Sequence, residues 1–152
     1  NISPPLYPYL PEGQTITLVP ENNPYIQKAK KFALTHSQDP EHPTGAIILL
    51  DGKIVGQGAN GSNFHKQIGC PRKWVKAKTG TMYWLCKGCS PKNHAEQRAI
   101  KDSGKTHTSI IGADIYLWGH WWCCESCWTN MMKAGIKNVH LSEEAQHHFK
   151  KS

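Results

Sequence analysis

The spacing of apolar side chains divides the chain into helical and strand-like segments. After the pair Asn23-Pro24, which is typical of a helix start, apolar residues recur at intervals of three and four. This periodicity predicts a helix that ends near His36. Its buried face would consist of Ile26, Ala29, Phe32 and Ala33.

A second pattern follows directly. Residues 45–50 are almost uniformly apolar, residues 53–58 are strand-like, and Asp51-Gly52 separates the two runs. Two strand-like runs joined by an Asp-Gly pair predict a β-hairpin.

The rest of the chain alternates between helical and strand-like periodicity. The predicted elements are a helix from an Asn93 N-cap to about Lys101, a strand over 110–118, a helix over 125–133 ended by Ala134-Gly135, a strand over 139–141 and a helix over 143–150. Helices that alternate with strands favour an α/β fold. We therefore expect a three-layer α/β/α sandwich with a mixed central sheet, in which the helices over 93–101 and 125–133 share one face.

The length of 152 residues fits a single domain. Five prolines in the first twenty residues disfavour a helix or a sheet interior there. We expect residues 1–22 to form an extended arm and residues 23–152 to form the domain. No run of apolar residues approaches the roughly 20 needed for a membrane span, so no membrane association is expected.

The formal charge of +7 is unevenly distributed along the chain. Between Gly52 and Ala95 there are eight Lys or Arg residues and no Asp or Glu. Such a segment favours an anionic partner, and phosphate is the obvious candidate. A solvated basic loop that keeps the protein in solution explains the same composition equally well.

Candidate chemistry is concentrated at two predicted helix starts. His94, Cys124 and Cys127 supply three zinc ligands, while Glu96 stands two residues after the histidine. A catalytic zinc site has three protein ligands and an open position for water, whereas a structural site has four. Glu96 would then be free to move protons at a water molecule activated by the metal. The alternative is a zinc ion that only stabilises the fold.

A second metal site is predicted in the long segment between the hairpin and the helix at 93–101. Four candidate ligands fall there, namely His65, Cys70, Cys86 and Cys89. Three cysteines and a histidine form a closed, structural zinc site, which would order a segment that lacks periodicity. Unpaired thiols are the alternative. Cys-x-x-Cys spacing near histidines favours reduced cysteines over disulfides, and hence a cytoplasmic location.

The chain resembles the cytidine and deoxycytidylate deaminase superfamily, and deoxycytidylate deaminase most. The resemblance rests on the hairpin ending in Asn60, on His94-Ala-Glu96, and on Cys124-x-x-Cys127 with its Ala-Gly-Ile exit. It implies a catalytic zinc, proton transfer by Glu96, substrate contacts by Asn60 and the Ala95 backbone, and a homo-oligomer. Some deoxycytidylate deaminases carry an additional zinc in the segment that holds the second predicted site.

Two departures from the family pattern affect the expected substrate. Cys123 stands where the family usually has proline, and the segment from Trp118 to Trp122 is unusually aromatic. His120 and Trp121 are therefore candidate base contacts, although core packing or the end of a strand would also explain them.

Three functions remain open at this stage. The leading hypothesis is a zinc-dependent deaminase of a cytosine nucleotide or nucleoside, similar to an enzyme acting on dCMP. The second is a deaminase acting on a base within tRNA or single-stranded DNA. The third is a zinc-stabilised nucleic-acid-binding module without turnover.

Overall fold

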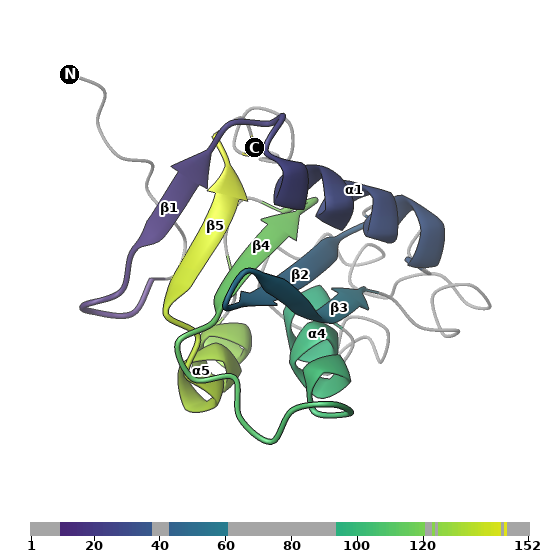
Figure 1. Cartoon of the computed structure of the whole chain (residues 1–152). Helices are drawn as coiled ribbons and strands as arrows, with labels where there is room; N and C mark the ends of the chain where they lie inside the picture. The colour runs from purple at the N-terminus through teal and green to yellow at the C-terminus, as the bar shows by residue number, and fades with distance from the viewer. Residues whose placement is uncertain are drawn as a thin grey trace, which may run out of the picture.

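The computed structural model describes residues 10–37, 43–60, 94–120, 123, 125–143 and 145. These residues form one mixed sheet with helices on both faces (Figure 1). In chain order the elements are β1 (Ile16–Val19), α1 (Pro24–His36), β2 (Gly45–Leu50), β3 (Lys53–Ala59), α4 (Ala95–Ser103), β4 (Asp114–Trp118), α5 (Glu125–Ala134) and β5 (Asn138–Ser142).

The strand order across the sheet is β1-β5-β4-β2-β3. β5 pairs in parallel with both β1 and β4, while β2 pairs antiparallel with β4 and β3. The sheet is therefore mixed, as predicted. The Asp51-Gly52 pair closes the β2–β3 hairpin with φ angles of 52° and 78°, which is the backbone that a tight two-residue hairpin requires.

The two faces of the sheet bury different helices. On one face α1 packs over a small core formed by Ile26, Ala29, Ile47 and Tyr116. On the other face α4 and α5 lie over a larger core, which contains Ile115, Leu117, Trp128, Met131 and Leu141 among others. Figure 1 shows α1 on the side of the sheet opposite to α4 and α5. The predicted three-layer α/β/α sandwich is confirmed, including the shared face of the two helices expected to carry metal ligands.

Helix α1 begins where the sequence predicts. Asn23 caps it, since its Oδ1 accepts hydrogen bonds from Tyr25 N at 2.9 Å and Ile26 N at 3.3 Å. The helix ends at His36, and the C-cap residue Ser37 donates its backbone N–H to Ala33 O at 2.9 Å.

Three expectations about element bounds were wrong. Ile16–Val19 belongs to the sheet as edge strand β1 and not to an arm outside it, because this segment contains no proline and three of its four residues are β-branched. The strand expected over 110–118 begins only at Asp114, after a turn at Gly112 with φ of 88°. Helix α4 begins at Ala95 with His94 as its N-cap.

Parts of the predicted organisation fall outside the described residues. They are residues 1–9 of the expected arm, Asn93, the segment over 61–93 and most of the helix expected over 143–150. Within the described ranges, no helix has both the length and the hydropathy that a bilayer span requires.

Candidate active site

The start of α4 carries two of the predicted site residues. His94 is the N-cap residue, with an extended backbone and its carbonyl oxygen accepting from Arg98 N at 3.1 Å. Glu96 lies in the first turn and is only 5% exposed. The positive end of the helix dipole favours a carboxylate at this position. Glu96 is thus a buried acid held next to His94 by the helix itself.

Helix α5 brings a cysteine to this histidine across 33 positions of sequence. Cys127 is fully buried, and its Sγ lies 3.3 Å from His94 Nδ1. Two ligands of one tetrahedral zinc ion, at ordinary Zn–S and Zn–N bond lengths, stand about 3.5 Å apart. The imidazole and thiol therefore fit a shared zinc ion, with Nδ1 as the histidine donor atom.

The third predicted ligand, Cys124, lies outside the described residues. Among the residues that the structure describes, no group of three or more candidate metal ligands is found. The neighbouring Cys123 is buried among the apolar side chains of the larger core. Neither Cys123 nor Cys127 is in a disulfide.

Sequence reasoning missed two polar residues of α4 that support the site. Gln97 Nε2 donates to Cys127 Sγ at 4.0 Å, and a donor facing the sulfur favours the thiolate that zinc binds. Arg98 Nη1 donates to Ala59 O at 3.3 Å, which ties α4 to the end of β3. Burial lowers the pKa of Arg98, but a guanidinium remains charged near neutral pH. The signal available in the sequence was their spacing, because Gln97 and Arg98 stand three and four positions after His94.

Asn60 follows β3 and is held by residues that flank two other elements. Its Oδ1 accepts from Thr44 N at 2.8 Å and from Ser37 Oγ at 2.6 Å. Its backbone N–H donates to Thr44 O at 3.1 Å. The predicted substrate contact therefore has a fixed side chain.

The remaining predicted contacts are only partly described. Ala95 is fully buried in the first turn of α4 and His120 is half-buried after β4, whereas Trp121 lies outside the described residues. The neighbouring Trp118 has a structural role, because its Nε1 donates to Glu21 at 3.4 Å. The Lys30 ammonium lies 5.8 Å from the centroid of the Trp118 ring.

All four residues of the second predicted zinc site, His65, Cys70, Cys86 and Cys89, lie outside the described residues. That site therefore stays a prediction.

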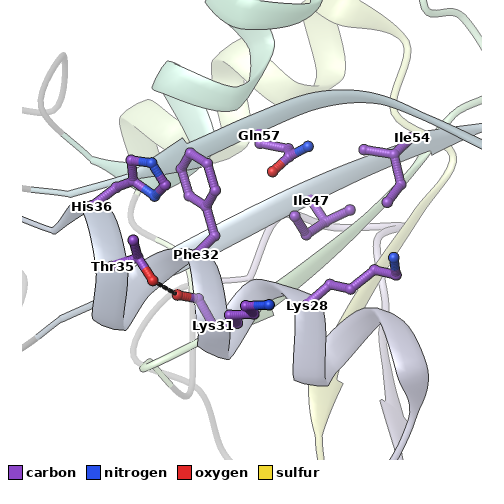
Figure 2. Close-up of a pocket in the computed structure, with 8 residues that line it drawn as sticks. All are labelled: Lys28, Lys31, Phe32, Thr35, His36, Ile47, Ile54 and Gln57. Atoms are coloured by element: carbon purple, nitrogen blue, oxygen red, sulfur yellow. Dashed lines mark hydrogen bonds between the residues drawn. The ribbon is translucent and has the colours of Figure 1, made fainter.

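A cavity of about 250 Å³ is found on the α1 side of the sheet. Figure 2 shows it between α1 and the β2–β3 hairpin, lined by Lys28, Lys31, Phe32, Thr35, His36, Ile47, Ile54 and Gln57. None of the predicted site residues lines it, so it is separate from the candidate active site.

The structure thus shows an α/β/α sandwich in which the side chains of His94 and Cys127 meet at the starts of two helices on one face of the sheet. The family profile described as the cytidine and deoxycytidylate deaminase zinc-binding region matches residues 20–143. The chain belongs to this family, which confirms the resemblance found in the sequence.

Individual relatives agree with this assignment. ComE operon protein 2 of Bacillus subtilis (strain 168) is 29% identical over 126 residues, which cover 83% of this chain and 61% of that protein. The dCMP deaminase of cyanophage S-TIM5, in its apo crystal structure, is 25% identical with a TM-score of 0.52, covering 78% of this chain and 82% of that one. Guanine deaminase of Bacillus subtilis shares the fold, with a TM-score of 0.51 at 20% identity, over 82% of this chain and 68% of that one.

Proposed function

We propose that this protein is a zinc-dependent hydrolytic deaminase of a cytosine nucleotide or nucleoside, with dCMP as the model substrate, and that it releases ammonia. One observation carries the proposal. Buried Glu96 stands in the first turn of α4, two residues after a histidine whose Nδ1 lies 3.3 Å from Cys127 Sγ. Family membership and the similarity to a dCMP deaminase support it.

The proposed catalytic zinc would be held by His94, Cys124 and Cys127. When bound, zinc supplies the positive charge that makes water a nucleophile near neutral pH. The residues of the chain then orient the substrate and move protons.

Glu96 is the proton carrier in this mechanism. Its carboxylate takes a proton from the attacking water and gives it to the ring nitrogen beside the amino-bearing carbon, which makes that carbon more electrophilic. The water oxygen then bonds to the carbon. Glu96 takes the remaining water proton and delivers it to the amino group. The carbon–nitrogen bond breaks, ammonia leaves and a carbonyl group remains on the ring.

Glu96→Ala tests the proposal. Removing a general acid–base typically lowers the rate by about 10²–10⁴-fold, and here the same carboxylate serves several transfers. We expect ammonia release from dCMP to fall at least that far, while the zinc content measured by atomic absorption stays that of the wild type. Turnover at the wild-type rate in this variant would refute the mechanism.

The matched control is Glu125→Ala. Glu125 occupies the first turn of α5 but is exposed, so this variant should keep both zinc and turnover. If it lost turnover as Glu96→Ala does, loss of a helix-start carboxylate in general would explain the result, and a role specific to Glu96 would be wrong.

Substrate size is tested separately, because the basic segment between Gly52 and Ala95 also suits a polymer. Nucleosides, nucleotides, tRNA and DNA oligonucleotides are assayed for ammonia release at several salt concentrations. Binding of a polymer weakens steeply with salt through counterion release, whereas binding of a single nucleotide has a shallow dependence. Release from polymers alone would favour the second hypothesis. No release from any substrate would favour the non-enzymatic binding module.

Three further proposals accompany this function. A second zinc on His65, Cys70, Cys86 and Cys89 predicts two zinc ions per chain rather than one. A homo-oligomer predicts a solution mass that is a multiple of 17.1 kDa. A cytoplasmic location is proposed from the Cys-x-x-Cys spacing, which favours reduced cysteines.

A further inference from the structure

We infer that Ser37, which follows α1, is a positioning residue that fixes the orientation of the Asn60 side-chain amide. The inference rests on the proposed function, because it takes Asn60 as a substrate contact. It adds the residue that sets the orientation of the Asn60 side chain.

The orientation of the Asn60 amide follows from its partners. A backbone N–H can only donate, so the Asn60 atom that lies 2.8 Å from Thr44 N must be the oxygen, Oδ1. Ser37 Oγ lies 2.6 Å from the same Oδ1 and 3.2 Å from Asn60 O. Because both of these atoms are carbonyl oxygens, the serine hydroxyl is the donor. Two donors therefore occupy Oδ1.

Ser37 is itself fixed by α1. Its backbone N–H completes the helix by donating to Ala33 O at 2.9 Å. The helix in turn lies directly on β2, since a Cβ at Gly45 would collide with Ala29 O and would stand 3.0 Å from Ala33 N. The serine hydroxyl is thus held at a fixed position over the end of β3, next to Asn60.

The end of β3 leads toward the start of α4. A Cβ at Gly56 would meet Ala99 and Ser103, whereas a Cβ at Gly58 would meet Ala95 O and Ala99 N. Moving along β3 toward Asn60 therefore means moving along α4 toward His94 and Glu96. Asn60 follows β3 at the end nearest the proposed metal ligands.

This geometry determines which atom of the Asn60 amide is occupied. Oδ1 accepts from Thr44 N and from Ser37 Oγ, and the other end of the amide, Nδ2, is a donor. Ser37 therefore sets the orientation of the amide without touching a ligand.

The test compares Ser37→Ala with Ser37→Thr, which keeps the hydroxyl. One hydrogen bond is typically worth about two- to tenfold in an equilibrium constant. We expect Ser37→Ala to raise KM for dCMP by about that factor, with kcat nearly unchanged, because the contact is made equally in ground and transition states. Ser37→Thr should restore most of the affinity. Thr35→Ala is the matched control, because that hydroxyl donates to Lys31 O within α1 (Figure 2).

A double-mutant cycle separates positioning from general stability. If Ser37 acts through Asn60, then Ser37→Ala has no further effect on KM once Asn60→Ala is present. Effects that simply add would overturn the inference. An equal rise in KM from Thr35→Ala would also overturn it, since it would mean that any change at the end of α1 has the same result.

A readout without turnover keeps this inference distinct from the proposed function. The side-chain amide of Asn60 gives a separate ¹⁵N–¹H₂ signal in the NMR spectrum of the zinc-loaded wild-type protein. We expect this signal to shift in Ser37→Ala and to stay in place in Thr35→Ala. An unchanged signal in Ser37→Ala refutes the positioning role whether or not dCMP is deaminated. A shift without deamination of dCMP would support the positioning role while contradicting the proposed function.

Discussion

Replacing Gly58 with alanine should disable the site without altering any residue that performs chemistry. Gly58 lies where β3 crosses the backbone of α4. A Cβ at this position would stand 2.9 Å from the carbonyl carbon of Arg98 and still closer to Ala95 O and Ala99 N. All three are backbone atoms, so no side-chain rotation can relieve the contact.

The required movement sets the size of the effect. Ordinary contacts of a Cβ begin at 3.4 Å, so α4 must move away from β3 by about 1 Å, and His94 and Glu96 must move with it. A displacement of this size in an active site costs roughly 100-fold in rate. Overpacking of a core typically costs about 1–3 kcal/mol of stability. We therefore expect a folded protein of reduced stability whose kcat/KM is about 100-fold lower.

The assay pairs ammonia release with urea unfolding followed by circular dichroism. Gly104→Ala is the control, because Gly104 has an ordinary helical φ of −65° and its added Cβ would stand 3.3 Å from Lys101 O. That contact requires a shift of only a few tenths of an ångström, so activity should be retained. Full activity in Gly58→Ala, at whatever stability, would refute the link between the β3–α4 contact and the site geometry.

Two further predictions concern stability. Burial, and then the nearby Asp114 carboxylate, raise the pKa of Tyr116 above its ordinary value. Since the unfolded chain loses this proton at lower pH than the folded chain, the free energy of unfolding should fall as pH rises above about 10. Tyr116→Phe should flatten that fall in urea titrations. The Glu21 carboxylate accepts hydrogen bonds from Trp118 Nε1 and Ser142 Oγ, so Glu21→Ala should cost about 1–3 kcal/mol through the loss of these two hydrogen bonds. Glu21→Gln should recover part of that loss, and equal stability of all three proteins would contradict the assignment.

The sequence determined the features that depend on neighbours along the chain. The N-cap at Asn23, the turn at Asp51-Gly52 and the helices near residues 95 and 125 were all predictable, because capping, turn chemistry and periodicity act over a few residues. The motif residues His94 and Glu96 were recognisable for the same reason, since a spacing of two places both at the start of one helix. The predicted start of β4 at residue 110 was wrong, because the apolar run in the sequence continues through a turn at Gly112.

The tertiary structure alone decided which distant residues meet. His94 and Cys127 come from different helices, and Gln97 reaches the same sulfur only because α4 and α5 share a face of the sheet. Ser37 meets Asn60 because α1 ends above the end of β3 on the opposite face. Membership of β1 in the sheet likewise depends on pairing with β5, more than 100 positions later. Such contacts are fixed by strand order and register, and local periodicity carries no information about either.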